Sequence, residues 1–379
     1  MTKFLLTVLG IWAAMHAFVF WRVSSVPWIR AHCPLWAIWV AALLLWASYP
    51  LARIFEARGW DRLGLPLEYF AANWIGTLFL LFALLLVLEV LSIPAWAWRA
   101  HLPVARGWTA VAALVLAVIA LIQGMRPPVI RDYEVRMPGL PADRDGLVVV
   151  HLSDLHLGTL IGQRWLAELV SRVNALKPDV ILMVGDVIDG NAQRVVPLVT
   201  ELSKLNAPLG VFAVTGNHEY YAGLEASIAV LRAAGFHVLR GESVEAAPGL
   251  VIAGVDDVTV RMRSGFPDTD VSNALTGRPP GATILLSHTP WNMTEAAQLG
   301  ANLMVSGHTH NGQIWPFTYL VKARYPHVSG QYEINGMSLV VGIGAGTWGP
   351  RMRLWRPGEI VRITLRSAPV ASIGKPTNQ

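Results

Sequence analysis

Four long apolar runs occupy the first third of the chain. They cover Phe4–Phe20, Leu35–Ala52, Trp74–Trp98 and Trp108–Ile122. A helix needs about 20 residues to cross the hydrocarbon core of a bilayer, and about 17 at the short end. The fourth run reaches that length only with Gln123 and Gly124. The pattern predicts a membrane domain of about four transmembrane helices within residues 1–125.

Two other interpretations of these runs are disfavoured. A cleaved signal peptide does not fit the first run, because no small-x-small cleavage site follows it and a second apolar run comes soon after. Buried helices of a soluble domain do not fit the tryptophan pattern. Eleven of the 16 tryptophans lie between Trp12 and Trp108, at or near the ends of apolar runs, where an amphipathic ring suits the membrane–water boundary.

The positions of Lys and Arg indicate an orientation. With the N-terminus inside, the inner segments hold Lys3, Arg53, Arg58, Arg62 and Arg126, and the outer loops hold Arg22, Arg30, Arg99 and Arg106. This small excess favours a multi-pass protein of the cell (inner) membrane with its C-terminal domain on the cytoplasmic side. Glu89 lies inside the third run, where a charge is costly and is a functional candidate. Because no partner is visible in the sequence, we favour a protonated or interhelically bonded Glu89 that fixes helix packing.

The composition narrows the chemistry. Charged residues make up only 15% of the chain, against about 25% in a typical soluble domain. The single cysteine, Cys33, excludes an intramolecular disulfide and a thiolate metal site. The formal charge of +5 has no clustered basic stripe, so we expect no nucleic acid partner.

After Pro127 and Pro128 the pattern changes to short apolar runs separated by turn residues. Strands are predicted at Val129–Met137, Leu147–Leu152, Val180–Val184, Leu209–Val214, Thr283–Leu286 and Leu303–Val305, and an amphipathic helix at Gln163–Leu176. Strands that alternate with helices indicate an α/β domain whose ligands bind at the strand ends.

Polar clusters follow five of these strands directly. They contain Asp154 and His156, then Asp186 and Asp189, then Asn217, His218 and Glu219, then His288, and finally His308 and His310. Each cluster alone is a weak signal. Five in order, all delivered to one edge of a sheet, predict a metal site built from carboxylates, imidazoles and an amide.

The segment from Leu147 to His310 resembles the calcineurin-like metallophosphoesterase family, with its pattern Asp-x-His, Gly-Asp-x-x-Asp, Gly-Asn-His-Glu, a lone His and Gly-His-x-His. The resemblance implies a layered α/β/β/α sandwich over residues 126–368, preceded by the all-α transmembrane bundle and followed by a polar tail at 369–379. The closing segment, Gly344 to Ile360, is similar to one bacterial, partly membrane-attached branch, and some relatives there hydrolyse the pyrophosphate of UDP-2,3-diacylglucosamine. Asn311 departs from the glycine usual in that branch.

The resemblance also implies two divalent metal ions. One metal would be held by Asp154, His156, Asp186 and His310, and the other by Asp186, Asn217, His288 and His308, so that Asp186 bridges them. A short anionic ligand shared between two close cations is also what a two-metal site requires physically. Nitrogen and oxygen ligands without Cys suit Mn, Fe or Zn better than Ca or Mg.

The predicted function is hydrolysis of a phosphate ester or pyrophosphate, with a lipid-linked molecule as a candidate substrate. A metal-bridging hydroxide would attack phosphorus, His218 would act as general acid, and Asp189 or Glu219 would orient their neighbours. Two alternatives stay open. One is a tethered general phosphodiesterase or protein phosphatase that acts on soluble substrates, and the other is a non-catalytic membrane scaffold that binds metal.

Two surface features bear on the substrate and stay open. The aromatic segment from Ile314 to Leu320 either rims the site and touches lipid or packs under a loop. Four arginines either neutralise substrate phosphates or form a solvated basic face near headgroups; they are Arg261, Arg263, Arg351 and Arg353.

Overall fold

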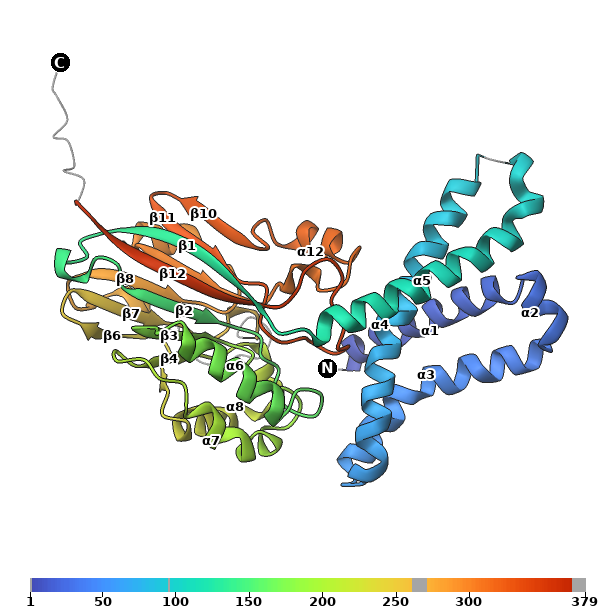
Figure 1. Ribbon diagram of the computed structural model, residues 1–379, viewed down its shortest axis with the longest axis horizontal. Helices are drawn as coiled ribbons and strands as arrows, with labels where there is room; N and C mark the ends of the chain where they lie inside the picture. Colours follow the sequence, from blue (N-terminus) through green and yellow to red (C-terminus); the bar gives the residue numbers. More distant parts are fainter. Residues whose placement is uncertain (1, 95, 261–270, 370–379) are drawn as a thin grey trace, which may run out of the picture. The chain divides into compact units, whose positions relative to one another are not determined.

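A computed structural model describes residues 2–94, 96–260 and 271–369 of the chain (Figure 1). It divides into two compact units. The helical unit comprises Met1–Met125 together with two short later segments, Ile314–Pro316 and Gly349–Arg356. The α/β unit comprises Arg126–Gln313, Phe317–Trp348 and Pro357–Gln379. Apart from Pro369, the predicted polar tail lies outside the described residues, as do Arg261 and Arg263.

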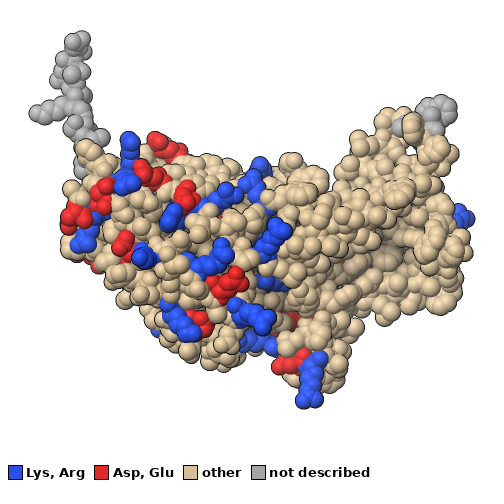
Figure 2. All heavy atoms as spheres, viewed as in Figure 1, with Lys and Arg blue, Asp and Glu red and all other residues tan. Residues whose placement is uncertain are grey.

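Four long helices dominate the helical unit. They are α1 (Thr2–Val23), α3 (Leu35–Ala57), α4 (Asp61–Ser92) and α5 (Leu102–Met125), with the shorter α2 (Pro27–His32) and the 3-10 helix η1 (Trp96–His101) in the connections. Three of the four predicted apolar runs are helical throughout, whereas in the third, Trp74–Trp98, helix α4 ends at Ser92. All four helices are long and apolar enough to cross a membrane. The face in view in Figure 2 has few charged side chains over these helices, mostly near their ends, whereas Lys, Arg, Asp and Glu intermingle over the α/β unit.

Glu89 is bonded between helices. Its carboxylate accepts two hydrogen bonds from Arg106 of α5, from Nε at 2.7 Å and from Nη2 at 3.1 Å. The Nη2 atom of Arg22 in α1 lies 3.4 Å from the same carboxylate, and Arg106 Nη1 donates to Ser25 Oγ at 2.9 Å. A paired carboxylate of this kind links α1, α4 and α5. The interhelical bonding favoured for Glu89 is confirmed, and its role in fixing helix packing stays a prediction.

Two six-stranded sheets form the α/β unit. The first has the order β1 (Val129–Pro138), β12 (Glu359–Ala368), β2 (Val148–Leu152), β3 (Val180–Val184), β4 (Val211–Val214) and β5 (His237–Val238). The second has the order β10 (Gly330–Ile334), β11 (Met337–Val341), β9 (Leu303–Ser306), β8 (Ala282–Leu286), β7 (Leu250–Gly254) and β6 (Glu242–Ala247). Strands β2, β3, β4 and β5 are parallel, as are β7, β8, β9 and β11.

The sheets stack with helices on both outer faces (Figure 1). Alternation along β3 explains the layering: Ile181 and Met183 enter the core under the helices, whereas Leu182 and Val184 enter the core between the sheets. Helices α6 (Gln163–Ala175), α7 (Val199–Leu202) and α8 (Asn217–Ala233) cover the first sheet, and α10 (Val271–Leu275) and α11 (Met293–Gln298) cover the second. The predicted α/β/β/α sandwich is therefore confirmed, and the parallel strands end at a common edge.

Candidate metal centre

The predicted ligands come from the carboxyl ends of strands in both sheets. Asp154 and His156 follow β2, and Asp186 follows β3. Asn217, the first residue of α8, follows β4 of the same sheet. In the second sheet, His288 follows β8, and His308 and His310 follow β9. The two sheets thus deliver all seven predicted ligand positions to the ends of their parallel strands.

The backbone at these positions adopts a conformation that L-residues rarely take. Positive φ values occur at Asp154 (53°), His156 (48°), Asp186 (52°), His308 (70°) and His310 (46°). Such strain is costly and persists mainly at functional sites, where surrounding structure enforces it. Five of the seven predicted ligands share it, so the loops are shaped to aim these side chains and not merely to connect strands.

Gly185 shows how tightly the loops are packed. It has a φ of 74°, and a Cβ there would lie 2.6 Å from Nδ1 of His288 and 2.7 Å from the backbone N of Gly216. No larger residue fits, because the turn before Asp186 passes directly against the neighbouring loops.

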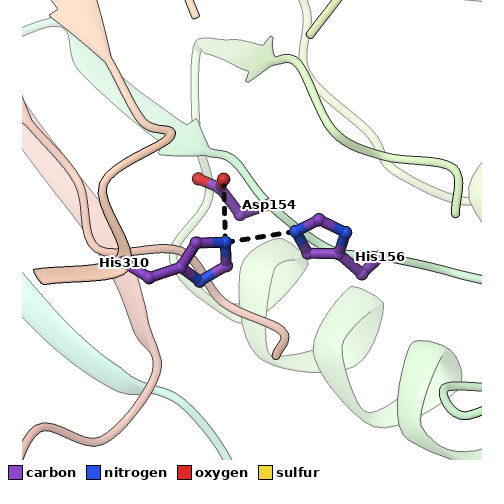
Figure 3. Close-up of side chains that lie close together, drawn as sticks. All are labelled: Asp154, His156 and His310. Atoms are coloured by element: carbon purple, nitrogen blue, oxygen red, sulfur yellow. Dashed lines mark hydrogen bonds and ion pairs between the residues drawn. The ribbon is translucent and has the colours of Figure 1, made fainter. Parts of the chain in front are cut away.

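Three buried side chains form a first cluster, Asp154, His156 and His310 (Figure 3). Nε2 of His310 lies 3.2 Å from Oδ1 of Asp154 and 3.1 Å from Nε2 of His156. Two ring nitrogens and a carboxylate oxygen therefore point at one place.

A second cluster joins Asp186, His288 and His308. Nε2 of His288 lies 3.1 Å from Oδ2 of Asp186 and 3.3 Å from Nδ1 of His308. The same Asp186 oxygen lies 3.9 Å from Nε2 of His156 in the first cluster. Asp186 is thus the carboxylate that both clusters share.

The donor set fits two cations. Oδ1 of Asn217 is buried and has no hydrogen-bond partner within the part of the chain that the structure describes. An orphaned buried amide oxygen is costly unless a ligand satisfies it. Facing imidazole nitrogens beside a carboxylate, with no thiolate, are ligands for a divalent transition metal. The residues present therefore suit the two metals that the sequence predicts.

The charges in the site stabilise one another. Burial alone would raise the pKa values of Asp154 and Asp186, but the neighbouring histidines hold both well below their ordinary range. Conversely, burial would lower the pKa of His288, but Asp186 raises it well above the ordinary value. Both aspartates are therefore anionic at neutral pH and ready to meet a cation.

His218 lies beside the first cluster and forms a third group of possible ligands with His156 and Asp189. Its Nδ1 is 2.8 Å from Oδ1 of Asp189, and its ring packs edge-on against His156 with 4.6 Å between centroids. Burial would lower the pKa of His218, but the charge of Asp186 and the hydrogen bond to Asp189 raise it to about 9. Asp189 therefore occupies one ring nitrogen, which leaves Nε2 as the group that a ligand can meet.

Glu219 holds the turns that carry these groups. Its fully buried carboxylate accepts backbone hydrogen bonds from Gly216, Asp186, Val187 and Ile188 at 2.7–3.0 Å. Burial, followed by the charge of Asp186, raises the pKa of Glu219 to about 7. A carboxylate enclosed in this way acts by positioning the loop after β3 and the start of α8.

The sequence analysis missed Tyr325. Its hydroxyl lies 2.9 Å from Nε2 of His308, the ring nitrogen opposite the one that faces His288. Tyr325 directly follows helix α12 (Thr318–Arg324), and its ring lies 5.6 Å from that of Trp291. A histidine that binds metal through one nitrogen is commonly oriented through the other. The only sequence signal is a tyrosine 15 residues after His310, which is too little to assign a partner.

The aromatic segment after His310 is split between the two units. Ile314 is buried in the core of the helical unit, in agreement with the packing interpretation for that residue. Tyr319 and Leu320 of α12 are 64% and 62% exposed, and these values disagree with packing under a loop. Arg351 and Arg353 are buried, so a solvated basic face is wrong for both.

Comparisons with known proteins agree with this geometry. Residues 147–312 match the family model described as calcineurin-like phosphoesterase. A zebrafish (Danio rerio) transmembrane protein with metallophosphoesterase domain is 36% identical over 67% of this chain, and the match spans 61% of the zebrafish protein. A metallophosphoesterase of Campylobacter jejuni is 32% identical over 68% of each chain. One of Aquifex aeolicus is 38% identical over 62% of this chain and 91% of its own length.

The chain therefore belongs to the calcineurin-like metallophosphoesterase family, a class of metal-dependent phosphoester hydrolases. Members of this family use a dimetal centre. The four apolar helices, together with relatives named as transmembrane proteins, identify a membrane protein.

Proposed function

We propose that this protein is a membrane-anchored two-metal phosphoesterase that hydrolyses a phosphate ester or pyrophosphate. The observation that carries the proposal is the pair of buried ligand clusters that share Asp186, with His218 beside them. A lone metal would need no shared carboxylate, and a structural site would need no unpaired imidazole nitrogen at its rim.

The ligand roles follow from the two clusters. Asp154, His156 and His310 would hold the first metal and His288, His308 and Asn217 the second, with Asp186 bound to both. When bound, the two metals would activate water and neutralise charge on the phosphoryl oxygens. Mn, Fe and Zn are the candidate ions, because all three accept mixed imidazole, carboxylate and amide ligands.

His218 would supply the proton to the leaving oxygen. Its Nδ1 is held by Asp189 at 2.8 Å, which fixes the ring so that Nε2 can donate. Asp189 and Glu219 are positioning residues in this proposal. Asp189 orients the imidazole, and Glu219 holds the backbone of Asp186 and its two successors.

A lipid-linked phosphate or pyrophosphate is the favoured substrate class. The membrane helices favour it, because they keep the site close to molecules confined to the bilayer. The exposed Tyr319 and Leu320, which follow the ligand loop along the chain, add an apolar surface. A soluble phosphodiester or phosphoprotein is the alternative, and it would make the helices a tether only. Because the C-terminal domain is expected on the cytoplasmic side, the substrate would be cytoplasmic or in the inner leaflet.

A substrate panel separates these classes. The detergent-purified full chain would be assayed with added Mn or with EDTA on a chromogenic phosphomonoester, a chromogenic phosphodiester and a lipid-linked UDP-sugar pyrophosphate. We expect metal-dependent cleavage with the highest kcat/KM on the lipid-linked compound. A preference for the soluble esters would retain the chemistry and reject the lipid-linked substrate. Metal binding without turnover of any compound would favour the scaffold.

Tyr325→Phe is expected to weaken the second metal site alone. The change removes the hydroxyl that orients His308, and loss of such a partner commonly lowers metal affinity about 10–100-fold. The measurement is the metal content per chain after dialysis against increasing concentrations of chelator. The second metal should leave the variant at a lower chelator concentration than it leaves the parent, and the first metal should leave both at the same concentration. Tyr332→Phe is a matched control, since its hydroxyl donates to the carbonyl of Ser329 at 2.8 Å instead of to a ligand histidine. Equal retention of both metals in Tyr325→Phe and the parent would reject the role of Tyr325.

A further inference from the structure

The helical unit contains a buried arginine that takes no part in the metal centre. Arg351 lies in the returning segment Gly349–Arg356 and is only 7% exposed. Trp355 and Arg356, at the end of the same segment, differ from it because they are exposed. A guanidinium stays charged at any physiological pH, so its burial requires an explanation.

Helices α4 and α5 fix the backbone on which Arg351 stands. Its N–H donates to Oδ1 of Asn73 in α4 at 2.9 Å, and two residues later Arg353 N donates to the carbonyl of Ala120 in α5 at 2.9 Å. A Cβ on Gly124 would lie 2.4 Å from the carbonyl oxygen of Arg351, so α5 is in direct contact with the segment. The side chain is therefore anchored at a defined place and is not a solvated surface arginine.

One nitrogen of the guanidinium, Nη1, lacks an acceptor among the described residues. Nη1 of Arg351 is buried and makes no hydrogen bond to any residue that the structure describes. Burial lowers the pKa of the Arg351 guanidinium, and the hydroxyl of Tyr69 opposes this only in part. The acidic residue next to Tyr69, Glu68, is already paired with Arg53 at 3.2 Å. An anion from outside the chain would complete the site.

The position of the Arg351 contacts along α4 and α5 indicates which kind of anion would bind. Asn73 directly precedes the apolar run that begins at Trp74, and Gly124 is the penultimate residue of α5. Both contact points thus mark the same boundary of the apolar stretches, where a bilayer presents its phosphate groups. Tyr69, with its ring 43% exposed, suits the same boundary.

We propose that Arg351 binds one phosphate group at the boundary of the bilayer, either in the headgroup of an anionic phospholipid or as a free phosphate. The planar guanidinium donates to two oxygens of such a group at once, and a basic site among transmembrane helices at this level is a known form of lipid recognition. The proposal uses none of the predicted metal ligands, so its test does not depend on the proposed hydrolysis.

The test uses the full chain, delipidated in an uncharged, phosphate-free detergent. Binding would be followed as the shift of the thermal unfolding midpoint on titration with phosphatidylglycerol, with an uncharged glycolipid, or with inorganic phosphate. The parent should be stabilised by phosphatidylglycerol and not by the glycolipid. Arg351→Met should bind the phosphate-bearing ligand at least about tenfold more weakly, because a charged hydrogen bond is lost. Arg356→Met, at an exposed position, should match the parent.

The titrations with phosphatidylglycerol and with inorganic phosphate distinguish the source of the bound phosphate. Stabilisation by inorganic phosphate equal to that by phosphatidylglycerol would assign a free phosphate, and a response to the lipid alone would assign a headgroup. Without ligand, Arg351→Met should unfold no earlier than the parent, because it removes a buried unpaired charge. If that variant does not fold, Arg351→Gln and the phosphorus content of the delipidated parent after titration give the same comparison. An equal response of parent and Arg351 variants to both phosphate-bearing ligands would overturn the proposal.

Discussion

Asp186→Ala is expected to abolish metal loading and hydrolysis together. Asp186 is the carboxylate that both ligand clusters share, with Oδ2 3.1 Å from Nε2 of His288 and 3.9 Å from Nε2 of His156. Without it, two cations would face each other with too little negative charge between them. We expect fewer than two metals per chain and a loss of kcat of at least about 1,000-fold.

Metal analysis and hydrolysis rates on the same preparation would measure both effects. Asp132→Ala is a suitable control, because this aspartate is an exposed surface residue of β1. Circular dichroism would show that both variants keep the sandwich. A folded Asp186→Ala protein that holds two metals and turns over substrate would refute the bridging role.

His218→Ala is expected to separate metal binding from turnover. His218 groups with His156 and Asp189 but lies outside the two clusters that contain the predicted ligands, so both metals should remain. Loss of a general acid typically lowers the rate about 10²–10⁴-fold, and we expect kcat to decrease by a factor in that range. The defect should shrink on a substrate whose leaving group needs no proton, such as a nitrophenyl ester.

Asp189→Asn provides the matched comparison for His218. It keeps the shape of the side chain and weakens the hydrogen bond to Nδ1 that orients the imidazole. Its loss of kcat should therefore be smaller than that of His218→Ala. A His218→Ala enzyme as fast as the parent on both kinds of leaving group would exclude the general acid role.

The sequence predicted the central strands well because their two signals are local. Val180–Val184 is apolar throughout since both of its faces are covered, and the Gly-Asp turn after it is a strong chain breaker. The prediction for β3 is correct at both ends. Within each sheet the ligand positions follow from the same logic, because side chains that directly follow parallel strands lie at one edge. The expectation that a single sheet carries all five clusters was wrong, since β2, β3 and β4 belong to one sheet and β8 and β9 to the other.

Elements that depend on distant partners were not predictable. Strand β12 pairs in parallel with β1, and the paired residues Val129 and Glu359 are 230 positions apart in the sequence. The sequence of neither strand indicates which strand it pairs with. The bond between Tyr325 and His308 and the pairing of Arg106 with Glu89 are likewise tertiary contacts. The hydrophobic pattern of a segment predicts which of its faces is buried, but it does not predict which polar side chain from a distant segment will contact it.

The return of later segments to the helices is another such case. The sequence division placed Ile314–Pro316 and Gly349–Arg356 in residues 126–368, whereas the structure groups both with α1 to α5. Ile314 and Leu354 form a β-bridge with each other, and Met352 is fully buried among the helices. Small residues at Gly76 and Gly124 make this packing possible, and small residues in an apolar helix give no sign of what they accommodate.

Metal titration of the full chain tests the central claim most directly. The purified protein would be stripped with EDTA, and hydrolysis of a chromogenic phosphodiester would be followed while Mn is added back and metal per chain is counted. We predict no hydrolysis in the stripped protein and full hydrolysis when two metals are bound per chain. Hydrolysis that persists after complete stripping, or two bound metals with no turnover of any phosphate ester or pyrophosphate, would contradict the account.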